Sequence, residues 1–122
     1  MFKLNVISDF SSAHRLQGYE GACRNLHGHN WKVRVGINAS KTDTVGMTVD
    51  FGVVKRHLTE LMDALDHRYL NELEYFKEMN PTSENIARVL FNELSKRLNG
   101  DFVRVCEVEI WESERSSVVY FE

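Results

Sequence analysis

The chain has 122 residues, of which 43% are hydrophobic and 27% are charged, and its formal net charge is −3. This size and composition predict one globular domain, 1–122, and the small negative charge gives no reason to expect nucleic acid as a partner. No apolar run is long enough to span a membrane, and the first residues, 1–5, lack the pattern of a signal peptide. Because two cysteines, Cys23 and Cys106, cannot form a disulfide framework, we expect free thiols and a cytoplasmic location.

The first half of the chain predicts two β-strands joined by a loop. Residues 2 to about 10 alternate between apolar and polar side chains, and 27–39 do so over a longer stretch. Between them, residues 15–26 lack periodicity and contain two glycines, so we expect a loop that carries Cys23. A polar turn is expected over 40–49. The apolar residues that share one face of the second strand are Trp31, Val33, Val35, Ile37 and Ala39.

Two amphipathic helices are predicted next. Asp50 is a suitable N-cap for the first helix, which should end near residue 66. Residues 71–80 form a polar connection that contains two aromatic side chains. Thr82 follows the only proline and offers a capping hydroxyl for the second helix, which should end near Gly100.

The chain ends in two more predicted strands, one around 106–111 and one over 118–121. In the first of these, alternation places Cys106, Val108 and Ile110 on the inward face. The order β-β-α-α-β-β predicts an α+β fold, in which an antiparallel sheet carries two helices on one face. Such a small sheet leaves its edges unpaired, so we expect a homo-oligomer that joins through them.

Three histidines form the strongest candidate for a chemical site. His27 and His29 lie two apart at the start of the second strand and therefore point to the same face as the apolar row, while His14 follows the first strand. Buried imidazoles need partners, and three of them would hold Zn²⁺ with one position open, as in catalytic zinc sites. The competing interpretation is a closed structural site in which Cys23 is the fourth ligand.

Two carboxylates occupy unusual positions. Asp66 precedes His67 at the end of the first helix, where it could orient the imidazole, although a histidine there also simply complements the helix dipole. Glu112 extends the inward row of the third strand, where the pattern demands an apolar residue. An unpaired carboxylate at such a position is unfavourable, so we expect it to meet a fixed donor or a ligand.

Six motifs, taken in order, resemble the 6-pyruvoyl-tetrahydropterin synthase superfamily, and within it the bacterial 6-carboxy-5,6,7,8-tetrahydropterin synthases of queuosine biosynthesis. The resemblance covers essentially the whole chain. Any one motif is a weak signal, but the ordered set is highly specific. The motifs are Phe10-Ser11-Ser12-Ala13-His14-Arg15, Cys23 followed after three residues by His27-Gly28-His29, Asp50-Phe51, Leu65-Asp66-His67, Asn80-Pro81-Thr82-Ser83-Glu84-Asn85 and Trp111-Glu112.

This resemblance implies a tunnelling fold, whose subunits join through sheet edges into barrels, usually as a hexamer of two stacked trimers. It implies that zinc is bound by His14, His27 and His29. It also implies a proton-transfer triad in which a neighbouring subunit donates two of the groups, with active sites at the subunit interfaces. The members of that triad would be Cys23, Asp66 and His67.

The substrate implied by the resemblance is 7,8-dihydroneopterin triphosphate. Glu112 would anchor the pterin and the segment Thr82, Ser83 and Glu84 would contact its ring. The products of the carboxy-forming branch are 6-carboxy-5,6,7,8-tetrahydropterin, acetaldehyde and triphosphate. Candidates to hold the triphosphate are Arg24, Lys32 and Arg115.

The three-residue gap between Cys23 and His27 resembles the carboxy-forming enzymes, because animal-type pyruvoyl synthases tend to have a longer gap. Glu20 lies in the same loop, and a further branch uses an upstream glutamate in place of the cysteine. Two alternatives stay open: a 6-pyruvoyl-tetrahydropterin synthase, which eliminates triphosphate without cutting the carbon chain, and a pterin- or purine-binding module that keeps zinc for structure.

Overall fold

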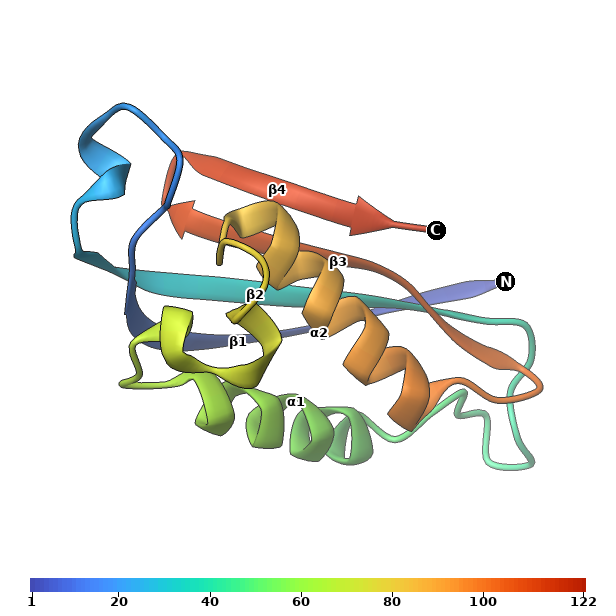
Figure 1. The fold of residues 1–122 in the computed structure, drawn as a ribbon. Coiled ribbons are helices and arrows are strands. Elements are labelled where there is room, and N and C mark those ends of the chain that lie inside the picture. Colours follow the sequence, from blue (N-terminus) through green and yellow to red (C-terminus); the bar gives the residue numbers. More distant parts are fainter.

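A computed structural model describes residues 1–122 as one four-stranded antiparallel sheet with two helices packed on one of its faces. The strands lie in the order β1-β2-β3-β4, so every neighbour in the sheet is also a neighbour along the chain or is reached through the helical segment (Figure 1). The predicted α+β architecture is therefore confirmed. The elements are β1 (Phe2–His14), β2 (His27–Ala39), α1 (Phe51–Leu65), α2 (Ser83–Leu98), β3 (Val103–Ser113) and β4 (Ser116–Phe121).

The core lies between the sheet and the helices because alternate strand residues and one stripe of each helix are apolar. Its largest side chain is Trp31, which is fully buried and stacks on Phe10 with ring centroids 5.8 Å apart. The alternation in β2 persists to its first residues: His27 and His29 are half-buried on the face of Trp31, whereas Gly28 and Asn30 are exposed. The histidine pair thus begins where the apolar core ends.

Both predicted helix caps are present. The Asp50 carboxylate accepts a hydrogen bond from the Gly52 amide at 2.7 Å, and the Thr82 hydroxyl accepts one from the Asn85 amide at 3.1 Å. These bonds satisfy amides that have no partner within the helix. Since α2 begins at Ser83, its cap fixes the place of the Thr82–Glu84 segment next to the sheet.

β1 is longer than predicted and reaches His14 instead of ending near residue 10. Its polar residues continue the ladder, with Ser12 opposite His29 and His14 opposite His27. The Ser12 hydroxyl donates to the Leu65 carbonyl, which gives this buried polar side chain a partner. A strand that ends in satisfied polar residues does not show as an apolar alternation in the sequence.

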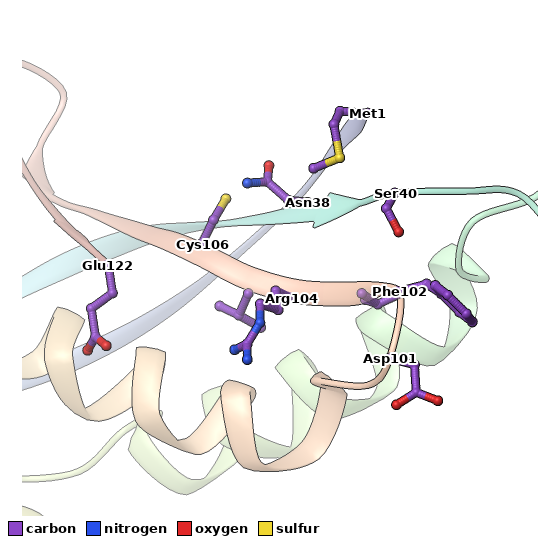
Figure 2. A pocket seen from close by; sticks show the side chains of 10 residues that line it. Met1, Asn38, Ser40, Asp101, Phe102, Arg104, Cys106 and Glu122 are labelled. Carbon is purple, nitrogen blue, oxygen red and sulfur yellow. The ribbon is translucent and has the colours of Figure 1, made fainter.

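The predicted inward position of Cys106 is wrong. A β-bulge between Gly36 and Ile37 shifts the register, so that Val105 is buried and Cys106 points away from the helices (Figure 2). The Cys106 thiol donates to the Gly36 carbonyl at 3.3 Å and lines a hollow of about 250 Å³. Beyond the bulge the alternation resumes, and Val108 and Ile110 are buried as predicted.

β1 and β4 are the edge strands of the sheet. The segment after α1 covers part of the β1 edge: the His67 amide donates to the Ser11 carbonyl at 2.6 Å, and the Ala13 amide donates to the Arg68 carbonyl at 3.1 Å. The connection 71–80 contains short 3-10 turns that were not predicted. Neither helix of the fold has the length and apolar character needed to cross a bilayer.

Candidate metal centre

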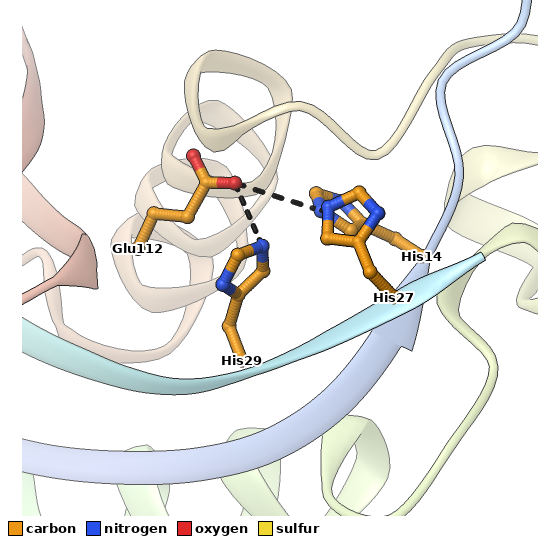
Figure 3. Close-up of side chains that lie close together, drawn as sticks. All are labelled: His14, His27, His29 and Glu112. Carbon is orange, nitrogen blue, oxygen red and sulfur yellow. Dashed lines mark hydrogen bonds and ion pairs between the residues drawn. The ribbon is translucent and has the colours of Figure 1, made fainter. Parts of the chain in front are cut away.

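The three predicted histidines converge with Glu112 at one end of the sheet (Figure 3). One ligand atom from each of the four residues lies within 4.8 Å of the others. His14 ends β1 and His27 begins β2, and antiparallel pairing sets them directly opposite each other. Glu112 is the penultimate residue of β3. The group is therefore formed where β1 ends, β2 begins and β3 ends.

Backbone carbonyls fix the orientation of two of the rings. His14 Nδ1 lies 2.8 Å from the Pro81 carbonyl, and His27 Nδ1 lies 2.7 Å from the Asn25 carbonyl. A carbonyl can only accept, so each Nδ1 carries its proton and each Nε2 of a neutral ring presents a lone pair. The two Nε2 atoms are only 2.9 Å apart. Two lone pairs at this distance repel unless a cation lies between them.

His29 and Glu112 complete the group. His29 Nε2 lies 2.8 Å from Glu112 Oε1, yet not along the direction of a hydrogen bond, so this buried nitrogen has no hydrogen-bond partner. The same carboxylate oxygen is 3.7 Å from His14 Nε2. Ser83 at the start of α2 donates to Glu112 Oε2 at 3.3 Å. A buried ring nitrogen without a hydrogen bond is unfavourable, and a metal ion would supply its partner.

Burial favours the neutral form of two of the histidines. It is the largest influence on His14 and lowers the pKa of this ring below its usual value; the Pro81 carbonyl and Glu112 oppose the shift, and the neighbouring imidazoles add to it. Burial likewise lowers the pKa of His29 against the pull of Glu112. Neutral imidazoles are the form that binds metal. Three convergent nitrogen donors with a carboxylate beside them fit a divalent metal ion.

Cys23 does not belong to the convergent group. It lies half-buried in a short 3-10 turn, Ala22–Arg24, and its carbonyl accepts a hydrogen bond from the Leu16 amide at 3.0 Å. Glu20 in the same loop is exposed. The residue that joins the histidines is therefore Glu112, for which the residue pattern predicted a fixed donor or a ligand and the family resemblance implied a pterin anchor.

Asp66 and His67 lie along the outer edge of β1. His67 Nδ1 is 2.8 Å from Asp66 Oδ2, and the His67 side chain is 83% exposed. The Ser11 amide donates to Asp66 Oδ1 at 2.7 Å, and this bond, helped by His67, holds the pKa of Asp66 below its usual value. His67 has a φ of 54°, a left-handed conformation that is uncommon outside glycine. The structure thus presents an oriented imidazole to the outside of the subunit.

The remaining predicted contacts divide between buried and exposed positions. Ser83 is buried beside Glu112, Thr82 is the helix cap, and Glu84 is exposed. Of the three triphosphate candidates, Arg24 lines a hollow of about 600 Å³ formed by the Cys23 loop, whereas Lys32 lies 4.7 Å from the centre of the Trp111 ring. Arg115 is exposed between β3 and β4.

Sequence reasoning missed the acceptors that orient the histidines. The carbonyls of Asn25 and Pro81 carry out this role. Every residue has a backbone carbonyl, so no residue type marks these two positions. The available signal was their place, since Asn25 lies two residues before His27 and Pro81 immediately precedes the Thr82–Glu84 segment.

Comparison with known proteins places these features in one family. Residues 3–122 match the family described as 6-pyruvoyl tetrahydropterin synthase. A 6-carboxy-5,6,7,8-tetrahydropterin synthase from Synechocystis sp. is 38% identical over 117 residues, covering 92% of this chain and 87% of the relative. One from Rickettsia typhi is 35% identical over 115 residues, covering 80% of this chain and 83% of the relative.

The fold agrees with solved structures. The 6-pyruvoyl tetrahydropterin synthase of Caenorhabditis elegans superimposes with a TM-score of 0.88 at 28% identity, covering 99% of this chain and 95% of that one. The expected tunnelling fold is thereby confirmed. A match along nearly the full sequence, together with this superposition, shows that the chain belongs to the 6-pyruvoyl tetrahydropterin synthase family.

Proposed function

We propose that the protein is a zinc-dependent lyase that converts 7,8-dihydroneopterin triphosphate to 6-carboxy-5,6,7,8-tetrahydropterin, acetaldehyde and triphosphate. The product would serve queuosine or another 7-deazapurine pathway in the cytoplasm. The observation that carries this proposal is the convergence of three imidazoles with Glu112 in a chain of this family. The short gap between Cys23 and His27, and relatives named as 6-carboxy-5,6,7,8-tetrahydropterin synthases, support the carboxy-forming branch.

The metal would be held by His14, His27 and His29. When bound, Zn²⁺ supplies Lewis-acid polarisation of the substrate side-chain hydroxyls. The Pro81 and Asn25 carbonyls orient two of the rings, those of His14 and His27, so that each Nε2 points toward the group. These contacts to the outer ring nitrogens also keep the imidazoles from rotating away.

Glu112 would anchor the pterin. The amide and amino group of a pterin form an edge with two donors, and a carboxylate can accept from both. Ser83 already donates to one oxygen of Glu112, which restricts the rotation of the carboxylate. Ser83 is buried at the start of α2, next to Glu112, which supports a contact between this segment and the pterin ring.

Proton transfer would use Cys23 together with Asp66 and His67. A thiolate near an imidazole is a competent base, and Asp66 holds His67 in one tautomer by accepting from Nδ1. Because the pair is exposed along the outer edge of β1, it is placed to reach a neighbouring subunit. We propose a hexamer of two trimers in which β4 meets the part of the β1 edge that the segment after α1 leaves uncovered, with active sites at the interfaces.

Product analysis tests the proposal. Zinc-loaded protein is incubated with 7,8-dihydroneopterin triphosphate without a reductant, and the products are identified by mass spectrometry. A 6-carboxytetrahydropterin with equimolar acetaldehyde is the expected result. A 6-pyruvoyl product would move the enzyme to the pyruvoyl-forming branch, which the similarity to the Caenorhabditis elegans structure supports.

A second experiment separates the enzyme from a binding module that keeps zinc for structure. The Cys23→Ala variant is expected to retain the zinc content of the wild type and to lose turnover. Loss of zinc from this variant would indicate a structural site with a cysteine ligand. Unchanged substrate with fully loaded wild-type protein would favour the binding module.

A further inference from the structure

The loop that carries Cys23 has almost no hydrophobic anchorage. It runs over 15–26 and projects beyond the end of the sheet (Figure 1). None of its residues is buried, and only Leu16 and Cys23 are even half-buried. Apolar packing is the usual means of fixing a segment, so the position of this loop must depend on other interactions.

Two asparagine side chains supply those interactions. Asn71 Oδ1 accepts from the Arg15 amide at 3.0 Å while Asn71 Nδ2 donates to the Arg15 carbonyl at 2.9 Å. Asn80 makes the same pair of bonds with Gln17, at 3.0 Å from the amide and 2.8 Å to the carbonyl. A carboxamide offers the donor and acceptor of a peptide unit, so each asparagine takes the place of a neighbouring strand.

The two clamps continue the bonding along the edge of β1. The segment after α1 bonds to Ser11 and Ala13, and the asparagines then bond to Arg15 and Gln17. These four residues are two apart, which is the spacing at which strand residues present their backbone groups to one edge. The bonding along this edge thus continues to Gln17, three residues past His14, where the pairing of β1 with β2 ends.

The clamped residues connect directly to the site. Leu16, between the two clamps, donates its amide to the Cys23 carbonyl. Asn80 precedes Pro81, whose carbonyl orients His14, and the Asn85 side chain donates to the Asn80 carbonyl at 2.9 Å. The short segment Asn80–Pro81 therefore contacts both His14 and the start of the Cys23 loop.

We propose that Asn71 and Asn80 are positioning residues that hold Cys23 in register with the histidine group. The inference rests on the proposed function in one respect, because that function assigns the proton transfer to Cys23. Neither asparagine touches the reacting atoms. Both restrict the motion of the loop. The Cys23 thiol is thereby kept close to the position at which the substrate side chain would bind.

The test uses Asn71→Ala and Asn80→Ala in the full-length, zinc-loaded oligomer. We expect amide exchange at Leu16 to become roughly tenfold faster in each variant, because the register that pairs Leu16 with Cys23 is released. Alkylation of Cys23 by iodoacetamide, followed on its own peptide, should accelerate severalfold. The kcat should fall by roughly tenfold with a smaller change in KM, since substrate contacts remain.

Two further variants sharpen the result. Asn80→Asp keeps the acceptor for the Gln17 amide and loses the donor to its carbonyl, so its exchange and alkylation rates should lie between those of wild type and Asn80→Ala. Asn99→Ala is the matched control. Asn99 accepts from the Val105 amide at 2.8 Å at the other end of α2, and its loss should leave exchange at Leu16 unchanged.

Unchanged exchange at Leu16 and unchanged alkylation of Cys23 in both alanine variants would overturn the proposal. So would faster exchange with an unaltered kcat, or an equal acceleration in Asn99→Ala, which would indicate general destabilisation. Exchange and alkylation need no turnover. If the wild type does not act on the pterin triphosphate, these two rates alone decide whether the clamps hold the loop.

Discussion

The Nε2 atoms of His14 and His27 face each other at 2.9 Å while both Nδ1 atoms are committed to backbone carbonyls. The arrangement leaves the metal-free protein with two opposed lone pairs. A metal held by these nitrogens would remove this repulsion. Metal binding would then be coupled to the stability of the sheet.

Metal loading should therefore raise the melting temperature. A ligand present at a hundred times its Kd stabilises the folded state by about 2.7 kcal/mol, which corresponds to a rise of roughly 10 °C in a domain of this size. Differential scanning calorimetry with and without a chelator measures the effect. An identical melting temperature for protein verified as loaded and protein verified as metal-free would contradict the coupling.

Replacing a histidine of the convergent group should lower the affinity for metal far more than replacing a histidine outside it. His29→Ala is expected to lower the affinity for Zn²⁺ by at least about a hundredfold, because it removes one of three nitrogen donors. His57→Ala is the control, since this half-buried histidine lies on α1 outside the convergent group. Competition with a chromophoric chelator gives both affinities. Equal affinities in the two variants would exclude His29 as a ligand.

Glu112→Gln separates the role of a pterin anchor from that of a metal ligand. A glutamine replaces one acceptor with a donor and removes the charge, so binding of a pterin should weaken by about tenfold or more. The zinc content should remain that of the wild type. Titration with neopterin and metal analysis measure the two quantities. Retained pterin binding with lost zinc would make Glu112 a metal ligand instead.

Glu109→Gln is the matched control for that variant. Its carboxylate lies on the same strand but bonds to Arg34 and Ser117, away from the histidine group. It should change neither pterin affinity nor zinc content. An equal loss of pterin binding in both variants would indicate that the strand, and not the Glu112 carboxylate, is responsible.

Ion pairs on the face of the sheet opposite the helices should make the stability of the fold sensitive to acid. Lys3 and Arg34 both pair with Glu107, and the Lys3 bond is the largest cause of a pKa of Glu107 below its usual value of 4.5. A carboxyl group with a lowered pKa stabilises the fold above its unfolded value and loses this contribution as the pH falls through the folded value. The stabilisation should thus be complete at neutral pH and decline below about pH 4.5.

The Glu107→Gln variant tests this relationship. We expect it to be less stable than wild type by about 1 kcal/mol at pH 7, and the difference should shrink as the pH falls below 4.5. Urea unfolding at several pH values gives the two curves. Glu78→Gln, at an exposed position, should follow the wild-type curve. A difference that is constant with pH would exclude the ionised carboxylate as its source.

The fold was predictable from the sequence wherever side-chain periodicity reports burial. The row from Trp31 to Ala39 and the capped helices follow this rule, and their positions are confirmed. The end of β1 could not be predicted in this way, because Ser12 and His14 are buried polar residues whose partners come from α1 and the Pro81 segment. The predicted inward position of Cys106 was wrong for a different reason. A bulge changes which residue faces inward without any change in the residue pattern.

The candidate site was predictable as a set of residue types but not as a geometry. Spacing places His27 and His29 on one face, and antiparallel pairing then brings His14 opposite His27. The approach of Glu112 depends on the register between β2 and β3, which the bulge sets. The carbonyls that choose the tautomers belong to residues whose side chains take no part, so the sequence carries no mark of them.

The exposed pair of Asp66 and His67 predicts that active sites are shared between subunits. The Cys23→Ala and His67→Ala variants should each be inactive alone. If the thiol and the imidazole come from different subunits, mixing equal amounts after reversible dissociation should restore roughly a quarter of the wild-type activity, because half of the sites receive an intact thiol and half of those an intact imidazole.

A mixture of Asp66→Ala with His67→Ala is the control for this complementation. Both changes damage the same donated pair, so every site receives one lesion or the other and no activity should return. Subunit exchange is verified by native mass spectrometry of isotopically labelled protein. Verified exchange without recovery in the first mixture would mean that Cys23 and His67 act within one subunit.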